Sequence, residues 1–390
     1  MDPFLNPYSP GAGRRPPELA GRAGEMRRFE VLVARVEQAR AERGLILTGL
    51  RGVGKTVLIN ELRSEAQRRG WIVGKVEAGG GRPLRALTAQ SLHQGLRAVT
   101  GRREADGRLR RALAVFKAFS LTVAPDGGLA LGLEVEPVAG QADSGDLELD
   151  LTELFVDLGE TSAELGIGTL LLVDEMQDLE RAELAALAGA CHETGQRDLP
   201  VIVVGAGLPN LPAVLTEAKS YAERLFEYRG IGPLAPDDAS AALTRPADGL
   251  GVRWERGALE VVLAASAGYP YFLQVFGRST WDHAFASPIR ATDAEQGVVA
   301  AQQELDFGFY GSRWERATPA QRTYLQGVAE GGEGSQSTAE VARRLGRRPG
   351  DVTVARDQLI RKGLLFAPDR GTIAFTVPGM ASFVLRQPLG

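Results

Sequence analysis

Residues 44–60 read GLILTGLRGVGKTVLIN, an apolar run followed by a glycine-rich turn and a helical pattern. Apolar residues 45–47 are typical of a buried parallel strand, and those between 57 and 66 recur at helical spacing. Gly49, Gly54, Lys55 and Thr56 complete the spacing GxxxxGK[ST]. Glycines let successive backbone N–H groups point inward, and the start of the following helix adds partial positive charge. The stretch therefore predicts a strand, a phosphate-binding loop and a helix.

This loop also predicts which residues contact a nucleotide. The backbone of the loop and the first helical turn comprise Gly49, Leu50, Arg51, Gly52, Val53, Gly54, Lys55, Thr56 and Val57. The ammonium group of Lys55 would reach the β- and γ-phosphates and take part in catalysis, and the hydroxyl of Thr56 would bind Mg²⁺. ATP and Mg²⁺ are therefore the expected cofactors.

Composition sets outer limits on fold and location. The 390 residues suffice for two or three domains, and 44% hydrophobic and 24% charged residues are ordinary for a globular protein. One cysteine excludes a disulfide within the chain, and three histidines argue against a zinc site. No stretch approaches 18 apolar residues and the first residues form no apolar leader, so we expect a soluble, cytoplasmic protein without membrane contact.

The alternation of strands and helices predicts the domain organisation. Residues 1–17, rich in Pro, Gly and Arg, are expected to form a flexible arm that either lies extended over the surface or is disordered alone. Apolar strands near 72, 169 and 201, with a further strand near 226, predict a three-layer α/β core with a parallel sheet over residues 18–234. Two β-rich runs around an Asp-Gly turn predict a hairpin insertion near 119–145, a candidate contact for a protein partner.

Two carboxylates follow the apolar strand that begins near residue 169. Asp174 and Glu175 stand at its carboxyl end, where a parallel sheet collects its ligand-binding residues. Downstream of a complete phosphate loop, Asp174 is expected to hold Mg²⁺ and Glu175 to accept a proton from the attacking water. The glutamate favours hydrolysis over binding alone.

Two further catalytic candidates are weaker. Asn210 is the first polar side chain after the strand near 201, and it either orients the water or caps a turn or helix. Arg224, with Arg229 behind it, either reaches the γ-phosphate of a neighbouring subunit or forms a surface ion pair. The first reading of Arg224 implies a nucleotide-dependent homo-oligomer.

The C-terminal third is expected to contain two smaller domains. Residues 235–311 predict an all-helical lid, and residues 312–390 predict a winged helix with three helices and a two-stranded wing. The latter segment carries 12 Lys and Arg against 7 Asp and Glu. Its candidate DNA contacts are Arg347, Arg348, Arg356, Arg361, Lys362 and Arg370. A winged helix that contacts protein instead of DNA is the open alternative.

Four motifs together resemble the AAA+ ATPases of the origin-recognition and archaeal-initiator type and their STAND relatives. These are GLRGVGKT at 49–56, LLLVDEMQD at 170–178, VIVVGAG at 201–207 and GYPYFLQ at 268–274. The resemblance implies that Gly21 and Arg22 belong to a box that closes over adenine, and that Pro270 packs against adenine. The chain departs from the initiator pattern because the strand near 201 ends without a polar sensor and Gly268, Tyr269 and Pro270 replace the lid arginine. These departures favour slow turnover.

The sequence thus predicts an ATP-binding and ATP-hydrolysing protein of AAA+/STAND type, and leaves two roles open. One is a DNA-associated ATPase of the initiator, loader or transposition-helper kind, in which the nucleotide controls the winged helix. The other is a nucleotide-dependent signalling or scaffolding switch that binds a protein partner. A small-molecule kinase is disfavoured because it would leave the lid and the winged helix without a role.

Overall fold

The core of the N-terminal part of the chain is built on one parallel sheet. The computed structural model describes residues 1–100, 119, 142 and 144–388. Five strands pair in the order β2-β3-β4-β1-β5, all parallel. Their bounds are β1 Gly44–Thr48, β2 Ile72–Glu77, β3 Thr169–Asp174, β4 Val201–Gly207 and β5 Phe226–Gly230. The expected parallel α/β core is confirmed, and the carboxyl ends of β1, β3 and β4 meet at one edge.

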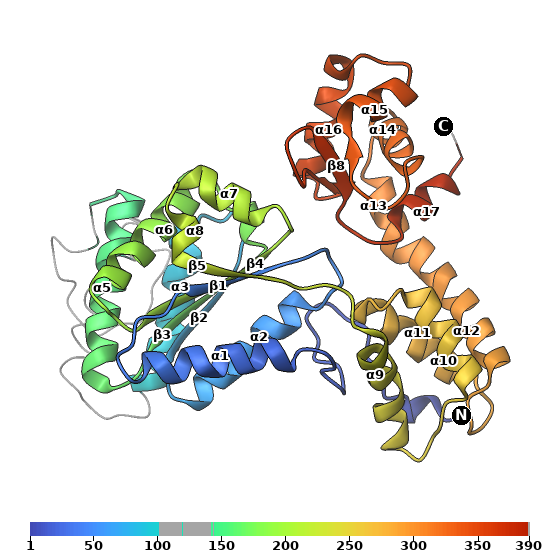
Figure 1. The fold of residues 1–390 in the computed structure, drawn as a ribbon, viewed down its shortest axis with the longest axis horizontal. Helices are drawn as coiled ribbons and strands as arrows, with labels where there is room; N and C mark the ends of the chain where they lie inside the picture. The colour runs from blue at the N-terminus through green and yellow to red at the C-terminus, as the bar shows by residue number, and fades with distance from the viewer. Residues whose placement is uncertain (101–118, 120–141, 143, 389–390) are drawn as a thin grey trace.

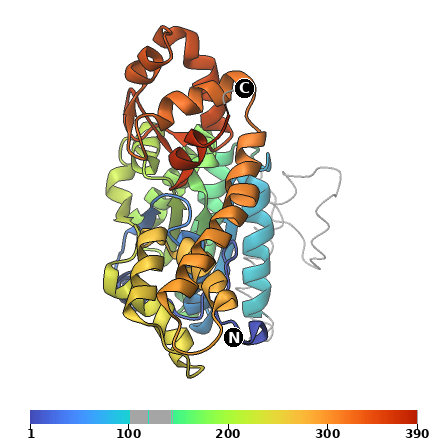
Figure 2. The same cartoon turned by 90° about the vertical axis from the view of Figure 1, so that its right-hand side faces the viewer.

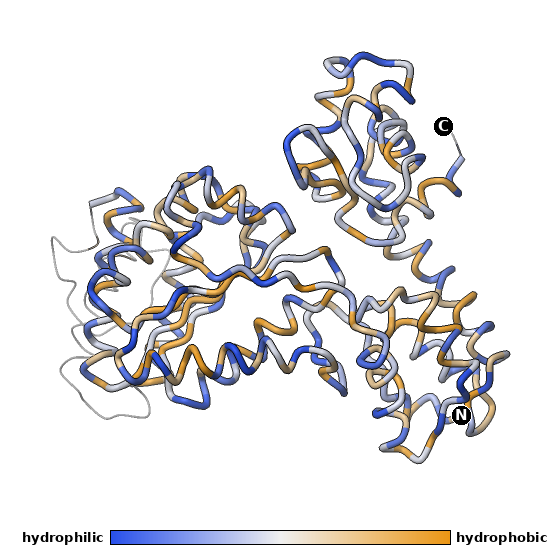
Figure 3. The backbone as a smooth tube through the Cα atoms, viewed as in Figure 1, coloured by the Kyte–Doolittle hydropathy of each residue, from blue (hydrophilic) through white to orange (hydrophobic). Residues whose placement is uncertain are grey.

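Helices cover both faces of this sheet. They are α1 Ala23–Val36, α2 Lys55–Arg68, α3 Leu84–Thr100, α5 Leu147–Leu165, α6 Arg181–Gln196, α7 Leu211–Ala218 and α8 Ala222–Leu225. In Figure 1, α1 and α2 lie on one side and α6 to α8 on the other. Figure 3 shows the apolar strands enclosed between these more polar outer faces. Except for 119, 142, 144 and 145, the predicted hairpin insertion lies outside the described residues.

A helical lid follows β5. It comprises α9 Pro236–Asp248, α10 Arg256–Ser266, α11 Pro270–His283 and α12 Ala291–Glu304. Beyond α12 the helix continues through a π-helical turn, Leu305–Tyr310 (η3), into α13, Gly311–Glu315. Figure 2 shows this continuous helix running from the lid to the C-terminal domain. The lid and the C-terminal domain are therefore joined by one helical connection.

The C-terminal domain has the order of elements of a winged helix. It contains α14 Pro319–Ala329, β6 Gln336–Ser337, α15 Thr338–Arg344, α16 Thr353–Arg361, β7 Leu365–Phe366 and β8 Thr372–Phe375. The three strands form an antiparallel sheet in the order β6-β8-β7. A last helix, α17 Met380–Leu385, packs against α14 and is anchored by Glu333, whose carboxylate accepts backbone N–H groups of Gly379 and Ala381.

The N-terminal arm packs on the lid. After a single 3-10 turn, Pro3–Leu5, the ring of Tyr8 is buried in the lid. The Tyr8 hydroxyl donates to the carbonyl of Leu243 at 2.6 Å and accepts from the indole of Trp254 at 2.9 Å. These two bonds satisfy a buried hydroxyl that would otherwise be costly to desolvate.

No helix among the described residues is both long enough and apolar enough to cross a bilayer.

Candidate nucleotide site

A cavity of about 450 Å³ opens where the phosphate loop, the lid and the N-terminal arm meet. Every loop residue from Arg51 to Val57 lines it, whereas Gly49 and Leu50 lie behind it. Gly52 and Gly54 have φ of +88° and +92°, which residues with a Cβ rarely adopt. Gly54 is the N-cap of α2, so the positive end of this helix faces the cavity. The local geometry is that of an anion cradle.

Lys55 is the buried cation of this cradle. Its ammonium group donates to the carbonyls of Gly49 at 2.7 Å and Leu50 at 3.0 Å. Burial lowers the pKa of Lys55 to about 8, against the opposing pull of Glu175 and Asp174. A polyphosphate would supply the missing negative charge.

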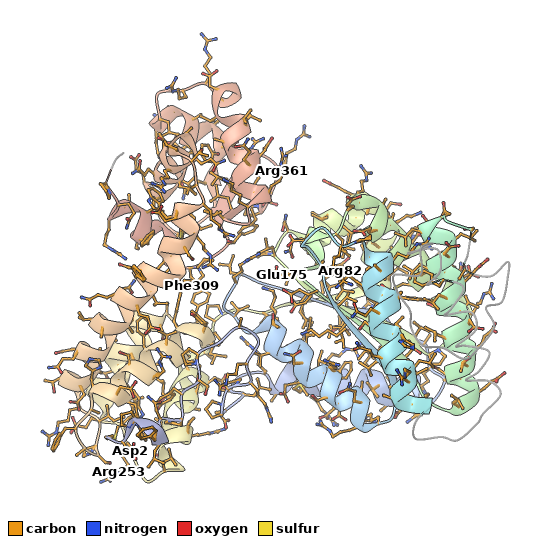
Figure 4. The ribbon with its side chains drawn as sticks, turned by 180° about the vertical axis from the view of Figure 1, so that it is seen from behind. Asp2, Arg82, Glu175, Arg253, Phe309 and Arg361 are labelled. Carbon is orange, nitrogen blue, oxygen red and sulfur yellow. The ribbon has the colours of Figure 1, made fainter. Side chains whose placement is uncertain are left out.

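Asp174 and Glu175 reach the site from β3. Asp174 is buried as the last residue of that strand, and its carboxylate accepts the backbone N–H of Glu175 at 3.0 Å. Glu175 has a left-handed backbone, with φ of +50°, and lines the cavity beside the phosphate loop. Figure 4 shows Glu175 where the sheet faces the lid. The strand end thus brings an acidic pair next to Lys55, although 119 positions separate Lys55 from Asp174 in the numbering of the chain.

Gln177 is a polar residue of this site that sequence reasoning missed. Its amide group donates to the carboxylate of Glu175 at 2.7 Å, and its amide oxygen accepts the backbone N–H of Leu208 at 3.0 Å. A Cβ on Gly207 would stand 2.5 Å from that oxygen, so a side chain there would displace the Gln177 amide. The polar group beside β4 is therefore supplied by the loop after β3. In the sequence, only the position of Gln177 in the motif LLLVDEMQD, two residues after Glu175, could have indicated a role in the site.

Arg22 joins two segments of the site by hydrogen bonds, whereas Gly21 forms no part of the cavity lining. The Arg22 guanidinium donates to the carbonyls of Val53 at 2.9 Å and Gly232 at 2.7 Å, which joins the phosphate loop to the segment after β5. Burial lowers the pKa of Arg22. Gly21 lies outside the cavity lining, where a Cβ would stand 2.9 Å from the carboxylate of Asp238. Pro270, the first residue of α11, lines the cavity as expected for a lid residue.

The winged helix touches the phosphate loop directly. The backbone N–H of Arg51 donates to the carbonyl of Thr376 at 3.0 Å. Leu208, Phe366 and Ala374 form a small apolar cluster between the end of β4 and the wing, with Leu50 packed against it. The Arg51 guanidinium also lies 3.6 Å from the carboxylate of Glu175. Arg51 of the loop therefore contacts both Glu175 and the C-terminal domain.

The structure does not bring the two weaker catalytic candidates into the cavity. Asn210 is the N-cap of α7, without a side-chain capping bond, and its buried amide oxygen has no hydrogen-bond partner among the described residues. Arg224 is exposed just before β5, at the edge of the sheet opposite the phosphate loop. From there it can reach a nucleotide only on another subunit. Arg229 lies within 4.0 Å of Glu25.

The fit to Mg²⁺ depends on the nucleotide. Within the part of the chain that the structure describes, no three His, Cys, Asp or Glu side chains form a ready metal cage. Mg²⁺ usually takes one or two protein oxygens and completes its shell with phosphate and water. The hydroxyl of Thr56 and the carboxylate of Asp174 match that small protein contribution.

The candidate DNA contacts fall into two groups. Arg347, Arg348, Arg361 and Arg370 are exposed, and no described carboxylate forms an ion pair with them. Figure 4 shows Arg361 on the side of the winged helix that is turned toward the core. By contrast, Arg356 pairs with Asp357 at 2.9 Å, and the Lys362 ammonium donates to the carbonyl of Arg316 and the amide of Gln321. The first group is the one available to phosphates.

Comparison with known proteins gives the following similarities. Residues 18–204 match the family model described as AAA ATPase domain, and residues 307–384 match a domain of unknown function, DUF8462. The chain is similar in structure to the Walker-type ATPase of Pyrococcus abyssi at 16% identity, covering 98% of this chain and 99% of that one with a TM-score of 0.63. No curated protein matches the chain.

Two other solved structures align more loosely. One is the ORC1 protein of Aeropyrum pernix in complex with DNA, at 18% identity, with 96% of this chain and 94% of that chain covered and a TM-score of 0.47. The other is the RuvB Holliday junction branch migration motor of Thermotoga maritima, at 16% identity, with 99% of each chain covered and a TM-score of 0.43. At these identities, likeness to solved structures speaks for the fold alone.

Proposed function

We propose, from the premise that residues 18–204 of this chain form an AAA ATPase domain on an AAA+ fold, that the cavity binds ATP with Mg²⁺ and hydrolyses it slowly. The observation that carries the proposal is the meeting of Lys55, the positive end of α2 and Glu175 in one cavity, with Asp174 at the end of β3 close enough to act on the charge of Lys55. Such a constellation binds a triphosphate and offers a base for water beside it.

Cationic groups of the site would bind the phosphates, and its acidic groups would act on water and Mg²⁺. Lys55 and the loop amides would bind the phosphates, and Glu175 would accept a proton from the attacking water. Bound Mg²⁺, held by Thr56 and Asp174, would neutralise developing phosphate charge. Gln177 would hold the carboxylate of Glu175 in place, because it donates to that group from a fixed position against β4. Arg51, close to the same carboxylate, would compete for it and keep turnover slow.

The nucleotide would control the posture of the winged helix. Support comes from the bond between Arg51 and Thr376 and from the apolar cluster around Leu208, because both contacts join the loop that binds phosphate to the C-terminal domain. We further propose that the exposed arginines of this domain bind the DNA backbone. These four arginines form no ion pair with a described carboxylate, so their guanidinium groups can bind phosphates. Phosphate contacts do not by themselves select a DNA sequence.

A second candidate function is a nucleotide-dependent switch that binds a protein partner. The observation that favours it is Val354, an apolar residue that is 67% exposed on α16, the helix that would enter a DNA groove. An exposed apolar side chain there suits a protein surface better than a charged backbone. DNA binding at low salt separates the two functions.

The test of the ATPase is a comparison of two variants with the parent chain. Lys55→Ala is expected to abolish binding of ATP, because the loop loses its buried cation. Glu175→Gln is expected to keep ATP affinity and to lose turnover, because the amide cannot accept the proton. Equilibrium binding and phosphate release measure the two effects. A Glu175→Gln variant that hydrolyses ATP at the parent rate would remove Glu175 from the role of base.

A further inference from the structure

The lid contributes only neutral groups to the nucleotide cavity, yet a cation enters from the helix that follows it. From α11, Pro270, Tyr271 and Gln274 line the cavity. Beyond the lid, Arg313 of α13 lines it as well. We propose that Arg313 binds the terminal phosphate of the nucleotide and so makes the helix that leads to the winged helix sensitive to ATP as opposed to ADP. This inference rests on the proposed function.

The charges around Arg313 call for an anion. Desolvation lowers the pKa of Arg313, and repulsion from Arg51 and Arg316 lowers it further. No described carboxylate forms an ion pair with it, and its guanidinium donates to the carbonyl of Phe309 at 2.5 Å. A half-buried cation next to another cation is costly unless an anion joins them. A phosphate would satisfy the remaining donors of both guanidinium groups.

The position of Arg313 points to the terminal phosphate rather than to the base. Arg51, whose charge lowers the pKa of Arg313 more than that of Arg316 does, lines the same cavity. It lies 3.6 Å from Glu175, the residue proposed to activate water. The water attacks the terminal phosphate, so the Arg51 side of the cavity is the terminal-phosphate side. Leu19, Ala20 and Ala242 supply apolar lining that suits the base.

A packed path holds Arg313 in this position. The backbone N–H of Tyr271 donates to the carbonyl of Gly52 in the phosphate loop at 3.2 Å. The Tyr271 ring stacks on Phe309 with centroids 5.1 Å apart, and the Arg313 guanidinium lies over the same Phe309 ring at 4.1 Å. Figure 4 shows Phe309 on the helix that joins the lid to the winged helix.

The π-helical turn sets the direction of this side chain. A π turn inserts one residue into the helical register and thereby re-aims the residues beyond it. Gly311 follows the turn where a Cβ would stand 2.7 Å from the carbonyl oxygen of Asp306. The sequence LDFGFYG therefore permits a turn that aims Arg313 at the cavity.

The test compares affinities for ATP, ADP and AMP, each with Mg²⁺, in the full chain. Arg313→Ala is expected to lower affinity for ATP about tenfold or more, to lower affinity for ADP less, and to leave AMP unchanged. Arg313→Lys, which keeps the charge, should recover part of the loss. The matched control is Arg316→Ala, an exposed arginine outside the cavity lining, which should bind all three nucleotides like the parent chain.

The outcomes separate this inference from the proposed function. If the parent chain binds ATP and Lys55→Ala does not, but Arg313→Ala matches the parent for ATP and ADP, the role of Arg313 is wrong while the ATPase proposal stands. If Arg313→Ala weakens all three nucleotides equally, the residue only supports the cavity and the inference is also wrong. If the parent chain binds no ATP, both proposals fall.

Discussion

The side chain of Lys55 shows how burial and charge act against each other at single-residue scale. Its ammonium group is almost fully buried, with only backbone carbonyls as hydrogen-bond partners among the described residues. Glu175 and Asp174 favour the charged form, but burial outweighs them and the pKa falls to about 8. A bound polyphosphate reverses that balance, because it adds negative charge within the cradle.

This balance predicts a pH dependence of ATP affinity. Since the nucleotide raises the pKa of Lys55, the bound state holds a proton that the free state loses above pH 8. Affinity should therefore be level below pH 8 and fall by up to about tenfold per pH unit above it. Binding titrations between pH 6.5 and 9.5 measure the effect. Lys55→Arg, whose guanidinium group keeps its proton across this range, provides the control and should show no such break.

Gln177 and Asn210 are the two candidates for the polar residue that acts near the end of β4. Both residues lie outside the cavity lining, but Gln177 bonds to Glu175, which lines the cavity, and to the backbone of Leu208. Gln177→Ala is therefore expected to lower kcat about tenfold with ATP affinity unchanged, because Glu175 loses a hydrogen bond that holds it. Steady-state hydrolysis and equilibrium binding measure both values. A larger loss of kcat in Asn210→Ala than in Gln177→Ala would show that Asn210 is the polar residue on which catalysis depends.

The N-terminal arm is the element whose place is least evident from its own residues. It is anchored by Tyr8 in the lid and then passes over the cavity, where residues 9–14 form part of the lining. At its far end the amide of Asn60 on α2 donates to the carbonyl of Gly13, and Arg15 pairs with Glu61 at 2.9 Å. The arm thus bridges the lid and the helix of the phosphate loop.

Loss of the anchor should open this bridge. Tyr8→Ala removes a buried ring whose loss costs about 3 to 5 kcal/mol in a core, so the arm is expected to detach. Tryptic cleavage after Arg14 should accelerate, and ATP affinity should fall several-fold. Phe4→Ala is the matched control, since Phe4 lies in the same arm but is 98% exposed. Equal cleavage rates in the two variants would mean that Tyr8 does not hold the arm.

At the scale of the whole molecule, the nucleotide cavity stands where three domains meet. The phosphate loop belongs to the core, Pro270 to the lid, and Thr376 of the winged helix contacts Arg51 from the other side. A ligand that binds at such a junction makes different contacts in each arrangement of the domains. Binding can therefore shift the equilibrium between these arrangements.

DNA binding by the winged helix can be tested through its exposed arginines. Replacement of Arg347 and Arg348 by alanine is expected to weaken binding of mixed-sequence duplex DNA and to reduce the salt slope by about 1.8, for two lost phosphate contacts. Fluorescence anisotropy from 25 to 200 mM salt measures both. The charge-matched control replaces Arg253 and Arg256 on the lid. Equal losses in the two double variants, or no binding by the parent chain at low salt, would contradict the DNA proposal.

Local sequence patterns determined the elements and their chemistry. The phosphate loop, the acidic pair of β3, the helical lid and the order of elements in the winged helix all follow from the spacing of glycines, apolar runs and caps. Such patterns can be read directly because each depends on neighbours within a few positions along the chain. The parallel α/β fold was predictable for the same reason, since alternating strands and helices permit few arrangements.

Only the tertiary structure decided which distant residues contact one another around the cavity. The bond of Gln177 to Leu208 spans 31 positions and that of Tyr8 to Trp254 spans 246, and no local pattern marks either pair. The packing of Arg313 against Phe309 depends on a π turn that propensity does not reveal. Contacts of this kind arise because chain segments remote in sequence bury surface against one another, so their partners exist only after the fold has formed.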